Sequence, residues 1–188
     1  MSYREIRIPE ELDRRVQEML EIPPQRHQTL GELVETYKGQ QGAPGPEDLV
    51  SERPTRHEAR VGEQTFHTHC FLDALVLPLV LGEERMEIRS ESPVSGEEIT
   101  AVVSDGAAAV EYSPPEAIAS FGVTRAGHGP PQLVGCPYIN AFSSRAEYER
   151  WEAETPQAVT TPLSVGDAFA LVRDAVGGAG APSERTGG

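Results

Sequence analysis

The chain has 188 residues, the size of one domain or of one domain with a small appendage. Its 30 acidic residues outnumber 16 Lys and Arg, and the resulting net charge of −14 argues against nucleic acid or an anionic membrane as the main partner. Two cysteines are too few for a disulfide framework, so we expect free thiols, metal ligands or catalysts in a reducing compartment.

The first 57 residues are predicted to form a short helical segment followed by a linker. Apolar residues at helical spacing predict a helix over residues 9–20. Thr29 and Glu32 make a capping-box pattern at the start of a second helix, and residues 39–46 are typical of a linker or long loop. No secretory signal precedes the first helix and no apolar run is long enough for a membrane span, so we expect a cytoplasmic location.

The most apolar run of the chain, residues 69–82, combines a thiol with a carboxylate. Residues 58–68 predict a hairpin that leads into a helix beginning near Cys70, with Pro78 inside it or in its last turn. Cys70 and Asp73 are three positions apart and would share one face of this helix. Because an unpaired carboxylate is costly to bury, this pair marks a candidate reactive site.

The sequence after this helix predicts an antiparallel sheet. Residues 86–90 and 98–112 are typical of strands, and Asp105-Gly106 is a hairpin-turn signal within the second stretch. Residues 114–120 are expected to form a short helix that begins at a Pro-Pro pair. We therefore predict an α+β fold, an antiparallel sheet core flanked by helices, with a short helical N-terminal appendage.

The second cysteine lies in a strand-like run over residues 132–142. Pro137 is excluded from a central ladder position, so we expect Cys136 at a sheet edge, a strand end or a bulge. Helices are expected over residues 144–154 and 164–176, and a disordered tail over residues 177–188.

The run from His69 to Gly82 resembles the Cys-x-x-Asp-x-(aliphatic)-x-x-Pro-x-x-x-Gly signature of organomercurial lyases, also called alkylmercury lyases. The similarity continues through Cys136 to Trp151. It implies an alkylmercury-lyase-like catalytic domain over residues 58–176, preceded over residues 1–57 by a reduced counterpart of a winged-helix-like region. The residue before the first cysteine is often aromatic in that family, whereas here it is a histidine.

The resemblance implies an enzyme that cleaves carbon–mercury bonds by protonolysis, with Cys70, Asp73 and Cys136 as its catalytic residues. Thiolates suit the soft Hg(II) ion, and Cys70 at a helix start is expected to have a lowered thiol pKa. Asp73 would relay a cysteine proton to the leaving carbon as a general acid. The products would be a hydrocarbon and Hg(II) held by Cys70 and Cys136, with Asp73 as a further candidate ligand.

This implied reaction needs no organic cofactor. Its partners would be the organomercury substrate and small thiols that take up Hg(II), with a mercuric reductase as a further candidate. No nucleic-acid or membrane partner is expected.

Other interpretations of the same residues remain open. Either cysteine could simply fill the core, and Asp73 could be a buried acid paired with Arg125. A zinc site could form from His67, His69 and Cys70 together with Cys136 or His128; otherwise His69 would line the mouth of the pocket. The rival function is a non-enzymatic protein of the same fold that binds, carries or senses a soft metal through its thiols.

Overall fold

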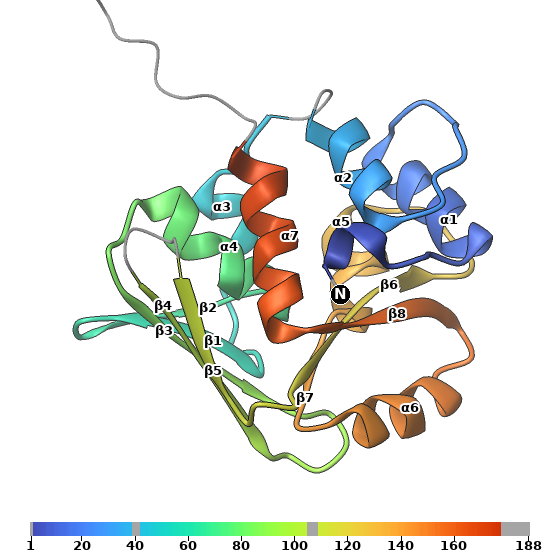
Figure 1. Ribbon diagram of the computed structural model, residues 1–188. Coiled ribbons are helices and arrows are strands. Elements are labelled where there is room, and N and C mark those ends of the chain that lie inside the picture. The colour runs from blue at the N-terminus through green and yellow to red at the C-terminus, as the bar shows by residue number, and fades with distance from the viewer. Residues whose placement is uncertain (1, 39–41, 105–108, 178–188) are drawn as a thin grey trace, which may run out of the picture.

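Two antiparallel sheets and the helices around them form the fold, in a computed structural model that describes residues 2–38, 42–104 and 109–177 (Figure 1). The helical elements are η1 (Tyr3–Glu5), α1 (Glu10–Leu20), α2 (Leu30–Lys38), α3 (Pro46–Leu49), α4 (Phe71–Leu81), α5 (Pro131–Val134), η2 (Cys136–Tyr138), α6 (Arg145–Ala153) and α7 (Val165–Gly177). The strands are β1 (His57–Val61), β2 (Gln64–His67), β3 (Met86–Glu91), β4 (Glu98–Ser104), β5 (Ala109–Ser113), β6 (Ile118–Thr124), β7 (Ala141–Phe142) and β8 (Ala158–Ser164). The predicted α+β class is confirmed.

The larger sheet has the strand order β2-β1-β3-β4-β5, and each neighbouring pair is antiparallel. Its strands alternate between the core and the outside, as Met86 and Ile88 on β3 illustrate, because successive side chains of a strand point to opposite faces. Helix α4 contacts β1 and β3 and covers the apolar face. The hairpin over residues 58–68 and the strands over residues 86–90 and 98–112 are confirmed, whereas the Asp105-Gly106 turn lies outside the described residues.

The smaller sheet has the order β7-β6-β8 and corrects two of the predicted elements. The helix expected over residues 114–120 is wrong, because its last three residues begin strand β6, which pairs with β8 along its full length, residues 118–124. The strand expected over residues 132–142 is also wrong. Pro131 begins the short helix α5, a 3-10 turn follows, and only Ala141 and Phe142 join the sheet. The proline at a helix N1 position is favourable, which explains why this stretch turns.

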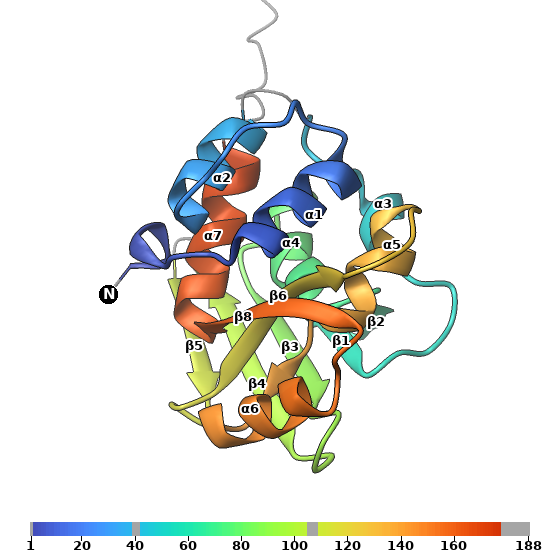
Figure 2. The ribbon, with the colours of Figure 1, turned by 90° about the vertical axis from the view of Figure 1, so that its right-hand side faces the viewer.

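The N-terminal helices pack onto the rest of the fold. The predicted helices over residues 9–20 and from Thr29 are confirmed as α1 and α2. Helix α2 and the turn η1 contact α7, and α1 contacts β6, an arrangement visible in Figure 2. The apolar residues of α1 and α2 belong to the same core as those of α4, for example Leu12, Val16, Leu30 and Leu33.

Both expected C-terminal helices are present as α6 and α7. Of the tail predicted over residues 177–188, Gly177 instead ends α7, and residues 178–188 lie outside the described part. Among the described helices, none combines the length and apolar character that a membrane crossing requires.

Candidate active site

Cys70 lies at the N-cap of α4, where the sequence placed it. Its backbone is extended, with φ −147° and ψ 175°, and its Sγ accepts a hydrogen bond from the Asp73 backbone N–H at 3.4 Å. The Thr68 hydroxyl donates to the Cys70 carbonyl at 2.9 Å, and the Phe71 N–H donates to the Ile139 carbonyl at 3.2 Å. The last bond joins the start of α4 to the turn that follows Cys136.

Cys136 begins the 3-10 turn η2, and it is not part of a strand. The turn is held from two sides: the Ser120 hydroxyl on β6 donates to the Tyr138 carbonyl at 2.8 Å, and the Asn140 amide donates to the Pro137 carbonyl at 3.1 Å. Because the carbonyls of both residues that follow Cys136, Pro137 and Tyr138, accept these hydrogen bonds, the position of the turn and of its thiol is fixed.

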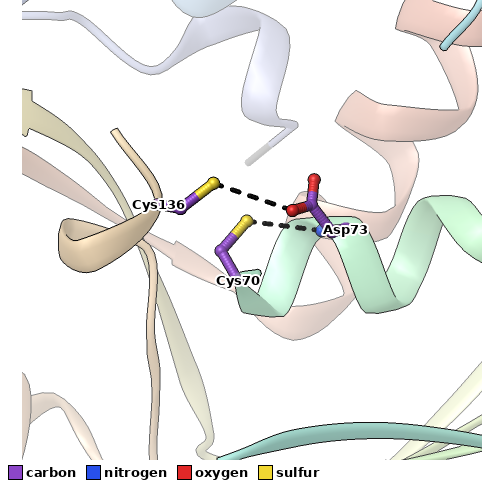
Figure 3. Close-up of side chains that lie close together, drawn as sticks. All are labelled: Cys70, Asp73 and Cys136. Atoms are coloured by element: carbon purple, nitrogen blue, oxygen red, sulfur yellow. Dashed lines mark hydrogen bonds between the residues drawn. The ribbon is translucent and has the colours of Figure 1, made fainter. Parts of the chain in front are cut away.

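The two thiols and the carboxylate meet in one cluster (Figure 3). The Cys136 thiol donates to Oδ2 of Asp73 at 3.7 Å. One donor atom from each of Cys70, Asp73 and Cys136 lies within 4.8 Å of the others, and it is the one group of this kind in the described residues. The structure therefore brings together all three residues that the sequence singled out.

Burial dominates the electrostatics of this cluster. It raises the pKa of Asp73 from its ordinary value of 3.8 to about 6, although hydrogen bonds from both thiols oppose the rise. Burial also raises the pKa of the Cys70 thiol, and the neighbouring Cys136 and Asp73 add to that effect. The expectation of a lowered thiol pKa at Cys70 is therefore wrong in the free protein. One hydrogen bond at the helix N-terminus does not offset the loss of solvent.

The cluster lies in the wall of a cavity of about 260 Å³, which we call the apolar cavity. Its other walls are mainly aliphatic side chains from α1, α2, α4 and α7 and from the turn after Cys136, among them Val16, Leu33, Val76, Ile139 and Val172. A cavity with apolar walls and a few convergent polar groups is the usual form of a small-molecule site.

The contribution of α1 and α2 to this cavity was not predicted. The apolar spacing in residues 9–20 and near Leu33 predicts buried helix faces, but the same spacing serves a solid core and the wall of a cavity. Only the packing of both helices against α7 distinguishes the two cases.

The alternative partner for Asp73 is contradicted. Arg125 forms an ion pair with Glu11 of α1, and its Nε donates to the Pro156 carbonyl. Arg125 is therefore engaged away from Asp73, which agrees with the raised pKa of Asp73.

The histidines do not join the thiols in the structure, which contradicts the zinc alternative for the described residues. The ring of His67 accepts a hydrogen bond from the Thr55 N–H and lies near Glu58. His128 lines a separate cavity beside α1. His69 lines a second cavity and not the mouth of the apolar one, so its expected position is wrong.

Comparisons with known proteins agree with this geometry. The family model described as alkylmercury lyase matches residues 50–177. A solved structure described as the mercury-bound form of MerB2 has 21% sequence identity and a TM-score of 0.57, over 70% of this chain and 63% of that one. This likeness shows a shared fold, and the present chain spans less than two thirds of that protein's length. A comparison with curated proteins found no match. Because the family model covers more than half of its residues, the chain belongs to the alkylmercury lyase family.

Proposed function

We propose that this protein cleaves carbon–mercury bonds by protonolysis at Cys70, Asp73 and Cys136. The observation that carries the proposal is the cluster itself: two thiols and one carboxyl group within 4.8 Å, in the wall of an apolar cavity. Membership of the alkylmercury lyase family supports the same reaction.

The first steps attach mercury to the two sulfurs. The Cys70 thiol displaces the thiolate that the organomercury compound carries, and its proton leaves with that thiolate. The Cys136 sulfur then forms a second sulfur–mercury bond and gives its proton to Asp73. The 3.7 Å hydrogen bond from the Cys136 thiol to Oδ2 supports this direction of transfer. Because thiolates are soft ligands, both bonds to Hg(II) are strong.

Asp73 then serves as the general acid. Two thiolates push electron density through mercury onto the attached carbon, and the proton on Oδ2 passes to that carbon. The electron pair of the carbon–mercury bond becomes the new carbon–hydrogen bond, and Asp73 returns to its charged form. A carboxyl with a pKa of about 6 suits both halves of this relay, because it can accept and release a proton near neutral pH.

The apolar cavity suits the organic group of the substrate. Aliphatic side chains such as Val76 and Val172 line it, so an aryl or alkyl group can leave water there without losing polar contacts. The hydrocarbon product would leave through this cavity, and Hg(II) would remain on Cys70 and Cys136. The proposed reaction uses these side chains and exogenous thiols, with no resident cofactor. In a cell the ion would pass to small thiols or to a mercuric reductase in the cytoplasm, as part of mercury detoxification and mercuric resistance.

The test is hydrocarbon release from phenylmercury or methylmercury in the presence of excess small thiol. We expect catalytic turnover by the wild type and its loss in Cys70→Ser, Cys136→Ser and Asp73→Asn. Asp48→Asn is a matched control, because Asp48 also lines the apolar cavity but lies outside the thiol cluster. Stoichiometric mercury binding without hydrocarbon would contradict the proposal and leave a metal-binding protein.

A further inference from the structure

Cys136 separates two cavities of opposite character. It lines the apolar cavity together with Cys70 and Asp73, and it also lines a second cavity of about 430 Å³. The walls of this polar cavity include Arg56, His57, His69, Asn140 and Trp151. Cys70 and Asp73 do not line it. Of the two cysteines, Cys136 alone therefore contributes to the walls of both cavities.

The polar cavity favours an anion. The chain has a net charge of −14, yet none of the residues lining this cavity is acidic. Arg56 is exposed and forms no ion pair within the described part of the chain. An arginine at the edge of a cavity that has no carboxylate partner in the protein is well suited to bind the carboxylate of a ligand.

His57 in the wall of this cavity can offer a hydrogen bond. Nδ1 of His57 is within 2.8 Å of the Ser90 hydroxyl, and its other ring nitrogen has no partner among the described residues. Burial, with a smaller contribution from Arg56, lowers the pKa of His57 to about 3. The ring is therefore neutral at physiological pH, and the positive charge on this wall comes from Arg56.

We propose that the polar cavity binds a small anionic thiol, which removes Hg(II) from the protein by attacking it beside Cys136. The inference rests on the proposed function, because it concerns the product of that reaction. The volume of the cavity suits a small molecule, and Arg56 would bind a carboxylate of the thiol.

The exchange balances without an oxidant or a reductant. The sulfur of the incoming thiol forms a bond to Hg(II), and the bond between Hg(II) and Cys136 breaks. The proton of the incoming thiol goes to the Cys136 sulfur. A second thiol then displaces Cys70 in the same way, and Hg(II) leaves as a dithiolate complex. Organic groups and hydrocarbon would use the apolar cavity, so the two kinds of ligand do not compete for space.

Trp151 gives a direct test of binding, because it is the only tryptophan of the chain and it lines the polar cavity. The probe is S-methylglutathione, an anionic thioether that cannot exchange with a thiolate. We expect a saturable change in Trp151 fluorescence on titration of the metal-free wild type, and an affinity about tenfold lower in Arg56→Glu. Arg53→Glu is the matched control, since Arg53 is an exposed arginine three positions before Arg56 that does not line the cavity. No saturable change, or an equal affinity in Arg56→Glu, would overturn the proposal.

Mercury transfer tests the consequence of binding. Wild type and Arg56→Glu, each loaded with one equivalent of Hg(II), are mixed with glutathione or with neutral 2-mercaptoethanol, and the loss of the mercury–thiolate absorbance is followed. We expect transfer to glutathione to slow about tenfold in Arg56→Glu while transfer to 2-mercaptoethanol is unchanged. Equal slowing for both thiols would overturn the proposal. A failure of the proposed function would appear separately, as an absence of hydrocarbon from phenylmercury, and would leave the fluorescence titration to decide whether the cavity binds anionic thiols.

Discussion

The Sγ atom of Cys136 lies 3.7 Å from Oδ2 of Asp73, although 63 positions separate the two residues in the chain. Asp73 is presented by α4, whereas Cys136 is presented by a turn that β6 and Asn140 hold in place. The relative position of these two helical segments therefore determines whether a proton can pass from the thiol to the carboxyl group.

Asp73→Asn should abolish proton delivery and spare mercury binding. General acids contribute about 10²–10⁴-fold to rate, so we expect hydrocarbon release to fall by at least about 10²-fold. Hg(II) binding should persist, because both thiols remain. Release is measured by gas chromatography, and binding by titration of the mercury–thiolate absorbance. A variant that turns over at the wild-type rate would exclude Asp73 as the acid.

The same substitution should change how stability depends on pH. Burial raises the pKa of Asp73 from 3.8 to about 6. Between about pH 3.8 and pH 6, the Asp73 carboxyl is therefore protonated in the folded state and charged in the unfolded chain. Stability is therefore lost as pH rises through this window. At 1.36 kcal/mol per pKa unit, the loss is about 3 kcal/mol.

Asp73→Asn removes this titration. The free energy of unfolding of the variant, relative to wild type, should rise by about 3 kcal/mol between about pH 3.5 and pH 7. Urea unfolding at the two pH values measures it. A constant difference between the two proteins would show that Asp73 has an ordinary pKa in the folded state.

Cys70→Ser should separate stability from activity. Serine is a good N-cap residue, so its hydroxyl can accept the Asp73 N–H that the Cys70 sulfur accepts now. We expect the free energy of unfolding, measured by thermal denaturation, to change by less than about 1 kcal/mol while turnover is lost. Cys70→Ala, which has no side-chain acceptor, should be less stable than Cys70→Ser. The reverse order of stability would argue against the capping role.

Filling the apolar cavity should change substrate preference. Val76 lies three positions after Asp73 on α4 and lines the cavity. Val76→Phe should lower kcat/KM for phenylmercury about tenfold more than for methylmercury, because the larger organic group loses its space. Val61→Phe, on the edge of the hairpin and away from the cavity, serves as the control. Equal effects on both substrates would place the organic group elsewhere.

Gly31→Ala should be destabilising, against the usual effect in a helix. A Cβ at Gly31 would lie 2.8 Å from the Arg4 carbonyl oxygen and 2.9 Å from its Cα, so η1 must move away from α2. We expect the free energy of unfolding, measured in urea, to fall by about 1–3 kcal/mol. Gly166→Ala on α7 meets its neighbours at 3.5 Å or more and should instead be neutral or stabilising by up to about 1 kcal/mol.

Local chemistry made one half of the site predictable from sequence. A thiol, an acid three residues later and an apolar run specify a helix and its cap without reference to the rest of the chain. The raised thiol pKa at Cys70 could not be predicted in this way, because it depends on how completely distant elements exclude water.

The other half depends on pairing between distant segments. Residues 118–120 at the start of β6 were expected to end a helix, because Pro114-Pro115 resembles a helix start. The pairing of β6 with β8 instead involves residues about forty positions away. Strand β8 contains Pro162, which weakens its strand signal, but it lies at the edge of its sheet, where proline is tolerated. The turn that carries Cys136 is held by the Ser120 hydroxyl of β6, a contact between distant residues, whereas the sequence around Cys136 predicted a strand.

Part of the apolar cavity comes from residues that the family model does not match. Val16 and Met19 on α1 and Leu33 on α2 form part of its wall, whereas the match begins at residue 50. Under the proposed function, the residues before position 50 therefore share the choice of organic group with Val76 and the other cavity residues of the matched stretch. If the proposed function holds, mutation in this first stretch would change the range of organomercurials while the thiols and the acid, which lie in the matched stretch, are preserved. A chimera that exchanges only this first stretch with that of a relative would shift the substrate range toward the relative's and leave Cys70, Asp73 and Cys136 unchanged.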